Sequence, residues 1–213
     1  MDTDSFISTL AAEGPRKPML AMPVQMALWL VGNLLWLAAF ALHSGLRPDL
    51  PHKLDEMYYQ PELMLLFGLG VTSAIAELCL SRPDGYQIGW IKFVPFLFLV
   101  LWAVTAALNM DLMKSSALAL AMNDMHFDCV GCILAFSVPP GLAMFLMVRH
   151  GAPVNSLWAG GMTAGSVAAF AYLGLRLVEQ NDNPFHLLVW HALPVLVLCA
   201  IGMLAGKAFL RWK

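Results

Sequence analysis

Charged side chains are scarce in this sequence. Asp, Glu, Lys and Arg together make up only 12% of the 213 residues, whereas a soluble domain has about 25%. Hydrophobic residues make up 60%, against about 45–50% in a soluble domain. This shortage of charge excludes an ordinary soluble domain and predicts a membrane protein.

A secretory signal peptide is also missing. Residues 1–20 read MDTDSFISTLAAEGPRKPML, which begins with acidic residues, has no apolar core and carries basic side chains only at Arg16 and Lys17. A signal peptide has the reverse order, with basic residues followed by an apolar run. We therefore expect the first hydrophobic segment to remain in the chain as a membrane anchor.

The sequence lacks motifs of catalysis as well. It contains neither a glycine-rich nucleotide loop nor an HExxH motif, and no pairing of a nucleophile with a base stands out. The hydrophobic segments carry little charge, whereas an ion-coupled transporter is expected to bury more of it. We predict that the protein is not an enzyme and has no resident cofactor.

What the sequence does contain is six hydrophobic segments long enough to cross a membrane. A helix needs about 20 apolar residues to span the ~30 Å hydrocarbon core. The predicted spans lie at about 23–42, 62–80, 89–109, 129–148, 156–177 and 185–208. We therefore expect an all-α, polytopic membrane protein with an N-terminal tail at 1–22, a six-helix bundle at 23–208 and a short C-terminus at 209–213.

The basic residues predict how the bundle is oriented. If the N-terminus is cytoplasmic, most of them lie on the inner side: Arg16, Lys17, Arg82, Lys92, Arg149, Lys207, Arg211 and Lys213. Fewer lie on the outer side: Arg47, Lys53, Lys114 and Arg176. Lys and Arg are enriched in cytoplasmic loops, so both termini are expected to be cytoplasmic.

Two glycine pairs and one proline pair predict helix contacts. Gly161 with Gly165, and Gly202 with Gly206, have the G-x-x-x-G spacing that lets helices approach closely. They either pack within the bundle or join two chains in a homodimer.

The Pro139-Pro140 pair removes two helix donors from the fourth span, so the freed carbonyls must find partners inside the bundle.

The stretch MHFDCVGC brings candidate metal ligands to the start of the fourth span. If it is helical, Met122, Met125, His126, Cys129 and Cys132 lie along one face. Thiolates and thioethers suit soft ions such as Cu(I), and Cys with His suits Zn(II). His126, Cys129 and Cys132 are thus candidate ligands for transiently bound Cu, Zn or Cd, or a thiol-redox site. The alternative is that these residues only pack, as Met and Cys commonly do in apolar helices.

A histidine lies inside the predicted sixth span. His191 occurs in LLVWHALPV, and an ionisable residue at membrane depth is a functional candidate. Arg176, Glu179 or Cys129 are the partners we expect for it. The alternative is a neutral imidazole hydrogen-bonded to a neighbouring helix. The candidate signal-sensing residues are therefore Cys129, Cys132 and His191.

The N-terminal tail contains a short amphipathic pattern. Phe6, Ile7 and Leu10 follow at helical spacing, Gly14-Pro15 ends the pattern, and the basic pair Arg16-Lys17 comes next. Such a helix either lies on the membrane surface or binds in a groove of a cytoplasmic protein. Because so short a helix is marginal in isolation, we expect it to become ordered on binding.

Several short motifs follow one another along nearly the whole chain. They are DSFISTLAAEGPRKP at the start, SGLRPDL after the first span, a cysteine ten residues before the Pro-Pro pair, RHGAP after the fourth span, NPFHLLVWHALPV in the sixth and GKAFLRW at the end. In this order the sequence resembles the negative regulator of sigma F family, six-span anti-sigma factors of proteobacteria.

The resemblance implies a bundle in the bacterial inner membrane that receives an envelope stress signal. It further implies that the cytoplasmic N-terminal segment sequesters an extracytoplasmic-function sigma factor. In this interpretation Phe6, Ile7 and Leu10 pack onto the sigma factor, and Arg16 and Lys17 contact its acidic surface. Membrane lipid is the other expected partner, and no direct contact with nucleic acid is expected.

The resemblance also concerns the cysteines. In family members, outward-side cysteines are implicated in sensing heavy metals or oxidants. Cys129 matches the first of them, Glu179 stands at the position of the second, and Cys132 is an addition. We therefore predict an anti-sigma factor that releases its sigma factor on metal or oxidative stress. The alternative is a membrane soft-metal-binding or thiol-redox protein that uses His126, Cys129 and Cys132.

Overall fold

The regular secondary structure of the described residues is helical. A computed structural model describes residues 2–13, 20–111, 127–151 and 153–210. Within these ranges the chain forms helices and no strand. The predicted all-α fold is therefore confirmed.

The order of the helices follows the predicted spans. They are α1 (Thr3–Glu13), α2 (Met22–Ser44), α3 (Leu50–Leu54), α4 (Tyr59–Leu80), η1 (Pro83–Phe93), α5 (Val94–Asp111), α7 (Phe127–Arg149), α8 (Ser156–Val178), α9 (Pro184–His186), the π-helical η2 (Leu187–Ala192) and α10 (Leu193–Phe209). Six stretches are long and apolar enough to cross a membrane: Met22–Ser44, Tyr59–Leu80, Ile88–Asn109, Asp128–Arg149, Ser156–Val178 and Pro184–Phe209. The predicted number of spans is confirmed, and the helices are compatible with a multi-pass membrane protein.

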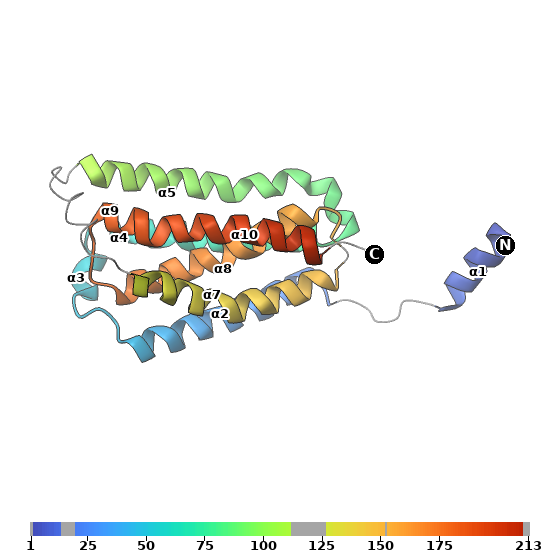
Figure 1. Ribbon diagram of the computed structural model, residues 1–213, viewed down its shortest axis with the longest axis horizontal. Helices are drawn as coiled ribbons and strands as arrows, with labels where there is room; N and C mark the ends of the chain where they lie inside the picture. Colours follow the sequence, from blue (N-terminus) through green and yellow to red (C-terminus); the bar gives the residue numbers. More distant parts are fainter. Residues whose placement is uncertain (1, 14–19, 112–126, 152, 211–213) are drawn as a thin grey trace.

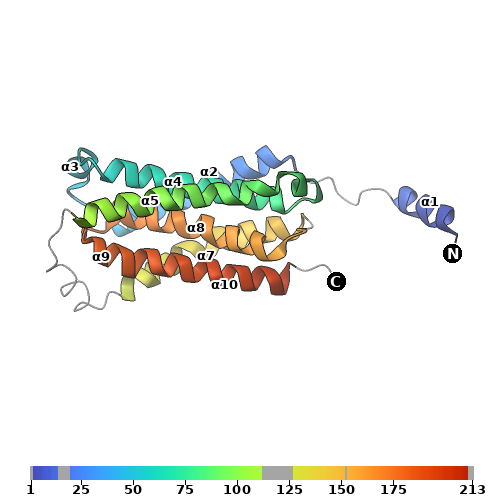
Figure 2. The same ribbon diagram turned by 90° about the horizontal axis from the view of Figure 1, so that it is seen from above.

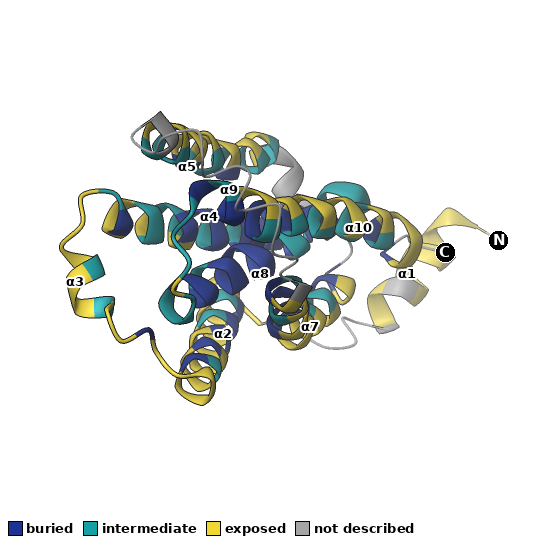
Figure 3. Ribbon diagram, turned by 60° about the vertical axis from the view of Figure 1, so that its left-hand side comes forward, coloured by how far each residue is buried: buried dark blue, intermediate teal, exposed yellow. Residues whose placement is uncertain are grey.

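Helix α8 lies at the centre of the bundle. It packs against α2, α4, α7 and α10, whereas α5 lies at the edge against α4 (Figures 1 and 3). In the most apolar part of α8, 78% of the residues are buried, whereas the corresponding share in the span that contains α5 is 11%. The sequence of α8, SLWAGGMTAGSVAAFAYLGLRLV, is rich in Gly, Ala and Ser. Small residues let neighbouring backbones approach, which suits this helix to the central position.

Helices α8 and α10 cross at close range through glycines. A Cβ atom on Gly160 would lie 2.7 Å from the Cα atom of Gly206, and one on Gly206 would lie 2.9 Å from the Cα atom of Gly160. Gly161, which the spacing singled out, faces the side chain of Met203 instead. The glycines of the sixth span therefore pack within the chain. A homodimer stays a prediction.

Two tryptophans of α2 meet the proline pair of α7. Pro140 lacks the N–H group that would bond to the carbonyl oxygen of Phe136. The indole N–H of Trp36 donates to that oxygen at 3.1 Å, and the indole N–H of Trp29 donates to the carbonyl oxygen of Pro140 at 3.1 Å. The freed carbonyl of Phe136 thus finds its partner in the first span.

The bundle has two distinct ends. Helices α3 and α9 lie at one of them, named here the α3 end, while α1 and the end of α10 lie toward the other, named the α1 end (Figures 1 and 2). The helices that finish at the α1 end are followed or closed by basic residues: Arg82, Lys92, Arg149 and Lys207. The residues singled out below lie at the α3 end.

Candidate functional site

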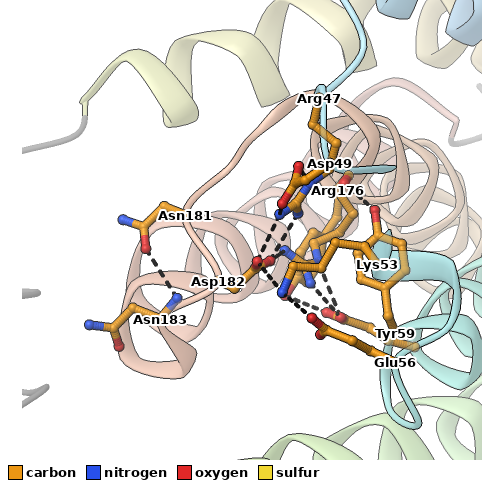
Figure 4. Close-up of polar contacts among 11 residues, drawn as sticks. Arg47, Asp49, Lys53, Glu56, Tyr59, Arg176, Asn181, Asp182 and Asn183 are labelled. Atoms are coloured by element: carbon orange, nitrogen blue, oxygen red, sulfur yellow. Dashed lines mark hydrogen bonds and ion pairs between the residues drawn. The ribbon is translucent and has the colours of Figure 1, made fainter. Parts of the chain in front are cut away.

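One carboxylate at the α3 end holds three cations. Asp182 follows α8, and both of its oxygens accept hydrogen bonds from Arg47, at 2.9 and 2.8 Å. Arg176 of α8 donates to Asp182 at 2.8 Å, and the ammonium of Lys53 in α3 lies 2.9 Å from it (Figure 4). Asp182 thereby ties the segment between α2 and α4 to the end of α8.

Further acids complete the charges around Asp182. Asp49 accepts two hydrogen bonds from Arg47 at 2.8 Å, Glu56 lies 2.6 Å from Lys53, and Glu62 lies 3.0 Å from Arg176. We name this group the Asp182 network. Its members are Arg47, Asp49, Lys53, Glu56, Glu62, Arg176 and Asp182. The side chains of Arg47 and Arg176 are almost fully buried, so their positive charges require these acids as partners.

The electrostatics keep Asp182 ionised. Burial alone would raise the pKa of Asp182, but hydrogen bonds from Arg47, Lys53 and Arg176 outweigh it and hold the pKa well below its usual range. Hydrogen bonds to Asp49 and Asp182 raise the pKa of Arg47. Asp182 and Arg47 are therefore both ionised at neutral pH.

Arg47 of this network and the neighbouring Tyr59 close the end of α8. The last carbonyl groups of a helix have no partner within the helix. Here the backbone N–H of Arg47 donates to the carbonyl of Leu177 at 3.0 Å, and the hydroxyl of Tyr59 donates to the carbonyl of Arg176 at 2.5 Å. The ring of Tyr59 lies 5.6 and 5.0 Å from the guanidinium carbons of Arg47 and Arg176. The segment after α2 and the first residue of α4 thus cap the central helix.

A second group at the α3 end combines a thiol, a carboxylate and two imidazoles. Its four members, named here the Cys129 cluster, are Cys129, Glu179, His186 and His191. One potential ligand atom from each lies within 4.8 Å of the others. The Sγ atom of Cys129 is 3.5 Å from Oε2 of Glu179 and 3.8 Å from Nε2 of His186. Cys129 and both histidines are buried, while Glu179 is partly exposed.

The local fold explains how both histidines reach this cluster. Asn183 caps α9 by accepting a hydrogen bond from the backbone N–H of Phe185 at 3.0 Å, and Pro184 follows at a position favourable for starting a helix. In an α-helix, residues five apart differ by roughly 140° around the axis. The π-helical turn at Leu187–Ala192 joins residues five apart, so it turns His191 toward the side of His186. Their ring centroids are 5.2 Å apart.

The chain matches the sequence profile of the family described as negative regulator of sigma F over residues 10–212. The chain belongs to the negative regulator of sigma F family. This family is a regulatory, non-enzymatic class, as the absence of catalytic motifs predicted.

Two relatives support this membership. The anti-sigma-F factor NrsF of Caulobacter vibrioides is 32% identical over an alignment of 224 positions that covers 100% of both chains. The probable anti-sigma-F factor NrsF of Azospira oryzae is 32% identical over 148 positions, covering 68% of each chain. No solved structure matches this member of the negative regulator of sigma F family.

The structure places the predicted sensing residues of this family member in different surroundings. His191 lies in the Cys129 cluster, beside two of the partners considered for it, Cys129 and Glu179. Cys132 is not a member of the cluster; it is half-buried and packs against the apolar core. His126 lies outside the described residues, so a site of His126, Cys129 and Cys132 stays a prediction.

His186 was missed at the sequence level, although NPFHLLVWHALPV contains both histidines. An α-helical interpretation puts His186 and His191 on different faces, and only the π-helical turn brings them together. A spacing of five residues between two histidines inside a span was the signal available.

All four cysteines lie in the described part of the chain, and each is a free thiol.

The predicted sigma-factor-binding residues lie on or after α1. Phe6 and Ile7 belong to α1 and are exposed. Leu10 also belongs to α1, but its side chain is not described. Arg16 and Lys17 lie outside the described residues.

Proposed function

We propose that this protein is an inner-membrane anti-sigma factor that holds an extracytoplasmic-function sigma factor through α1. The observation that carries the proposal is the exposed apolar surface of α1. Phe6 and Ile7 are 50% and 57% exposed, and the helix lies apart from the bundle (Figure 1). Relatives in the family are named as anti-sigma-F factors, and a sigma factor is the partner that such a surface would serve.

The short length of α1 fits coupled folding and binding. The helix has 11 residues, and an isolated helix of this length is only marginally stable in water. A groove on the sigma factor would cover Phe6, Ile7 and Leu10 and thereby stabilise the helix. Arg16 and Lys17, which follow it in the sequence, would contact the acidic surface beside that groove.

The distribution of charge supports a cytoplasmic α1 end. Arg82, Lys92, Arg149 and Lys207 lie near helix ends on that side. At the opposite end, by contrast, the cations of the Asp182 network are paired with acids. Basic residues favour the cytoplasmic side of a membrane. This orientation presents α1 to a cytoplasmic sigma factor and the α3 end to the cell envelope.

Release of the sigma factor would begin at the α3 end. A metal ion or oxidant of the envelope would reach Cys129 and its neighbours there, and change how the first turn of α7 packs against the end of α8. A signal can release a partner only if it favours a bundle conformation that binds the partner less tightly. We therefore expect two conformations of the bundle that differ in affinity for the sigma factor.

Co-purification from cells that express the full chain and the candidate sigma factor tests the proposal. Ile7→Asp puts a charge on the apolar surface of α1 and is expected to abolish co-purification. Ser8→Asp introduces the same charge on the opposite side of the helix and is expected to retain it. If the Ile7→Asp variant, inserted in the membrane as well as the wild type, still retains the sigma factor, α1 is not the binding segment.

A further inference from the structure

We propose that Cys129, Glu179, His186 and His191 form a binding site for one divalent metal ion of the Zn²⁺ or Cd²⁺ class. The site itself is independent of the proposed function, whereas its use as a release signal rests on it. The site does not include His126 or Cys132, the other residues predicted as metal ligands. The argument rests on the distances between the donor atoms, on their chemistry and on the segments that supply them.

The distances between donor atoms suit a tetrahedral ion. Zn²⁺ binds thiolate sulfur at about 2.3 Å and imidazole nitrogen or carboxylate oxygen at about 2.0–2.2 Å, so neighbouring donors are roughly 3.3–3.7 Å apart. The Sγ atom of Cys129 lies 3.5 Å from Oε2 of Glu179 and 3.8 Å from Nε2 of His186. All four donors lie within 4.8 Å of one another. Small side-chain movements would therefore complete the coordination shell.

The set of donors selects the class of ion. One thiol, two imidazoles and one carboxylate form the mixed S, N and O set that Zn²⁺ accepts. Hard ions such as Mg²⁺ and Ca²⁺ require oxygen ligands, and Cu(I) favours several sulfur donors. Cd²⁺ carries the same charge as Zn²⁺ and binds thiolates more strongly. On binding, the metal–sulfur bond replaces the S–H bond of Cys129, and the proton is released to solvent.

Three of the four donor residues are buried, and the fourth, Glu179, is partly exposed. Both histidines are fully buried and Cys129 is 5% exposed, so water is largely excluded from three of the donors. Glu179 follows α8 directly and is partly exposed, which lets an ion approach from the α3 end. The π-helical turn that carries His191 is a distortion that occurs frequently at functional sites.

The cluster is linked to the Asp182 network by one chain of contacts. The ring of Tyr172 packs against the ring of His191, with centroids 5.2 Å apart, and its hydroxyl donates to Glu62 at 3.3 Å. Glu62 in turn pairs with Arg176, which donates to Asp182. An ion bound at the cluster would join α7, the segment after α8 and the last span. It would thereby change the packing that the network holds in place.

Metal binding to the purified, reduced full-length protein tests the site directly. We expect one equivalent of Zn²⁺ or Cd²⁺ per chain, measured by competition with a chromophoric chelator. Cd²⁺ should also produce the ultraviolet absorption of a cadmium–thiolate bond. Cys129→Ser and His191→Gln should weaken binding by more than about 100-fold, because even substitutions outside the ligand shell cost about 10–100-fold.

Cys132→Ser is the matched control, because this thiol belongs to the same helix but not to the cluster. The Cys132→Ser variant should bind the metal as tightly as the wild type does. Binding that is unchanged in Cys129→Ser, or reduced equally in Cys132→Ser, would overturn the proposal. If a buried substitution prevents folding, Glu179→Gln provides a second test, because its partly exposed side chain is expected to tolerate the change and still weaken binding.

A third measurement separates this site from the proposed function. Without added metal, Glu179→Gln should retain the sigma factor as the wild type does. Added Zn²⁺ or Cd²⁺ should release the sigma factor from the wild type but not from this variant. Metal binding without release would overturn the signalling role and leave the site intact, whereas absence of metal binding would overturn the site and leave α1 binding untouched.

Discussion

The Sγ atom of Cys129 lies 3.5 Å from a carboxylate oxygen of Glu179, although 50 residues separate them in the sequence. The family resemblance puts a second cysteine at the position that Glu179 occupies here. The two positions therefore meet in space, and this chain has a carboxylate where a second thiol is expected. A thiol and a carboxylate cannot form a disulfide, but both can bind a metal ion.

This contact predicts the behaviour of Glu179→Cys. Since the two side chains face one another, mild oxidation of the variant should join the start of α7 to the end of α8 through a disulfide with Cys129. Non-reducing electrophoresis and mass spectrometry would detect the bond. It should persist when Cys132 is replaced by Ser and vanish when Cys129 is replaced. A bond that requires Cys132 instead would contradict the observed contact.

Asp182→Asn should destabilise the bundle. The substitution leaves the buried guanidinium groups of Arg47 and Arg176 with fewer acceptors, and an unsatisfied buried group costs about 1–3 kcal/mol. Thermal unfolding in detergent, followed by tryptophan fluorescence, would measure the loss. Asp49→Asn is the control, because Asp49 is more exposed and contacts Arg47 alone within the network. An equal loss in both variants would show that Asp182 is not the centre of the network.

Acid should weaken the same network. Although burial favours the neutral form of Asp182, hydrogen bonds from Arg47, Lys53 and Arg176 lower its pKa on folding. A carboxylate with a lowered pKa contributes stability above its unfolded-state pKa of about 4, and this contribution is lost as the pH falls below that value. The unfolding temperature of the wild type should therefore drop between about pH 5 and pH 3 more than that of Asp182→Asn. Parallel curves would exclude this role for Asp182.

Gly160→Val should disrupt the crossing of α8 and α10. A Cβ atom at Gly160 would lie 2.7 Å from the Cα atom of Gly206, and a backbone cannot move aside as a flexible side chain can. Overpacking of this kind costs about 1–3 kcal/mol or more, and thermal unfolding would measure it. Gly32→Val in α2 is the matched control, because a Cβ atom there meets nothing within 4 Å. Equal effects would mean that helix propensity, and not packing, decides the outcome.

Local features of the sequence predict the spans, their number and the short amphipathic segment before them. The length and composition of an apolar run are local properties, and the membrane requires about 20 such residues for each span. The scarcity of charge and the position of Arg16 and Lys17 after the pattern of Phe6, Ile7 and Leu10 are likewise readable without a fold. For this reason the sequence predicts the six spans and the helical N-terminal segment, and the structure contains both.

The side chains that meet at the α3 end are brought together by the packing of the bundle. Arg47 and Asp182 are 135 residues apart, and no periodicity connects them. Helical spacing grouped Cys129 with Cys132, but Cys129 lies with Glu179 and the two histidines, whereas Cys132 packs against the apolar core. His186 joined His191 because a π-helical turn changed the local periodicity. Contacts between distant segments and departures from regular helix geometry depend on the packing of the whole bundle, and a local pattern does not contain that information.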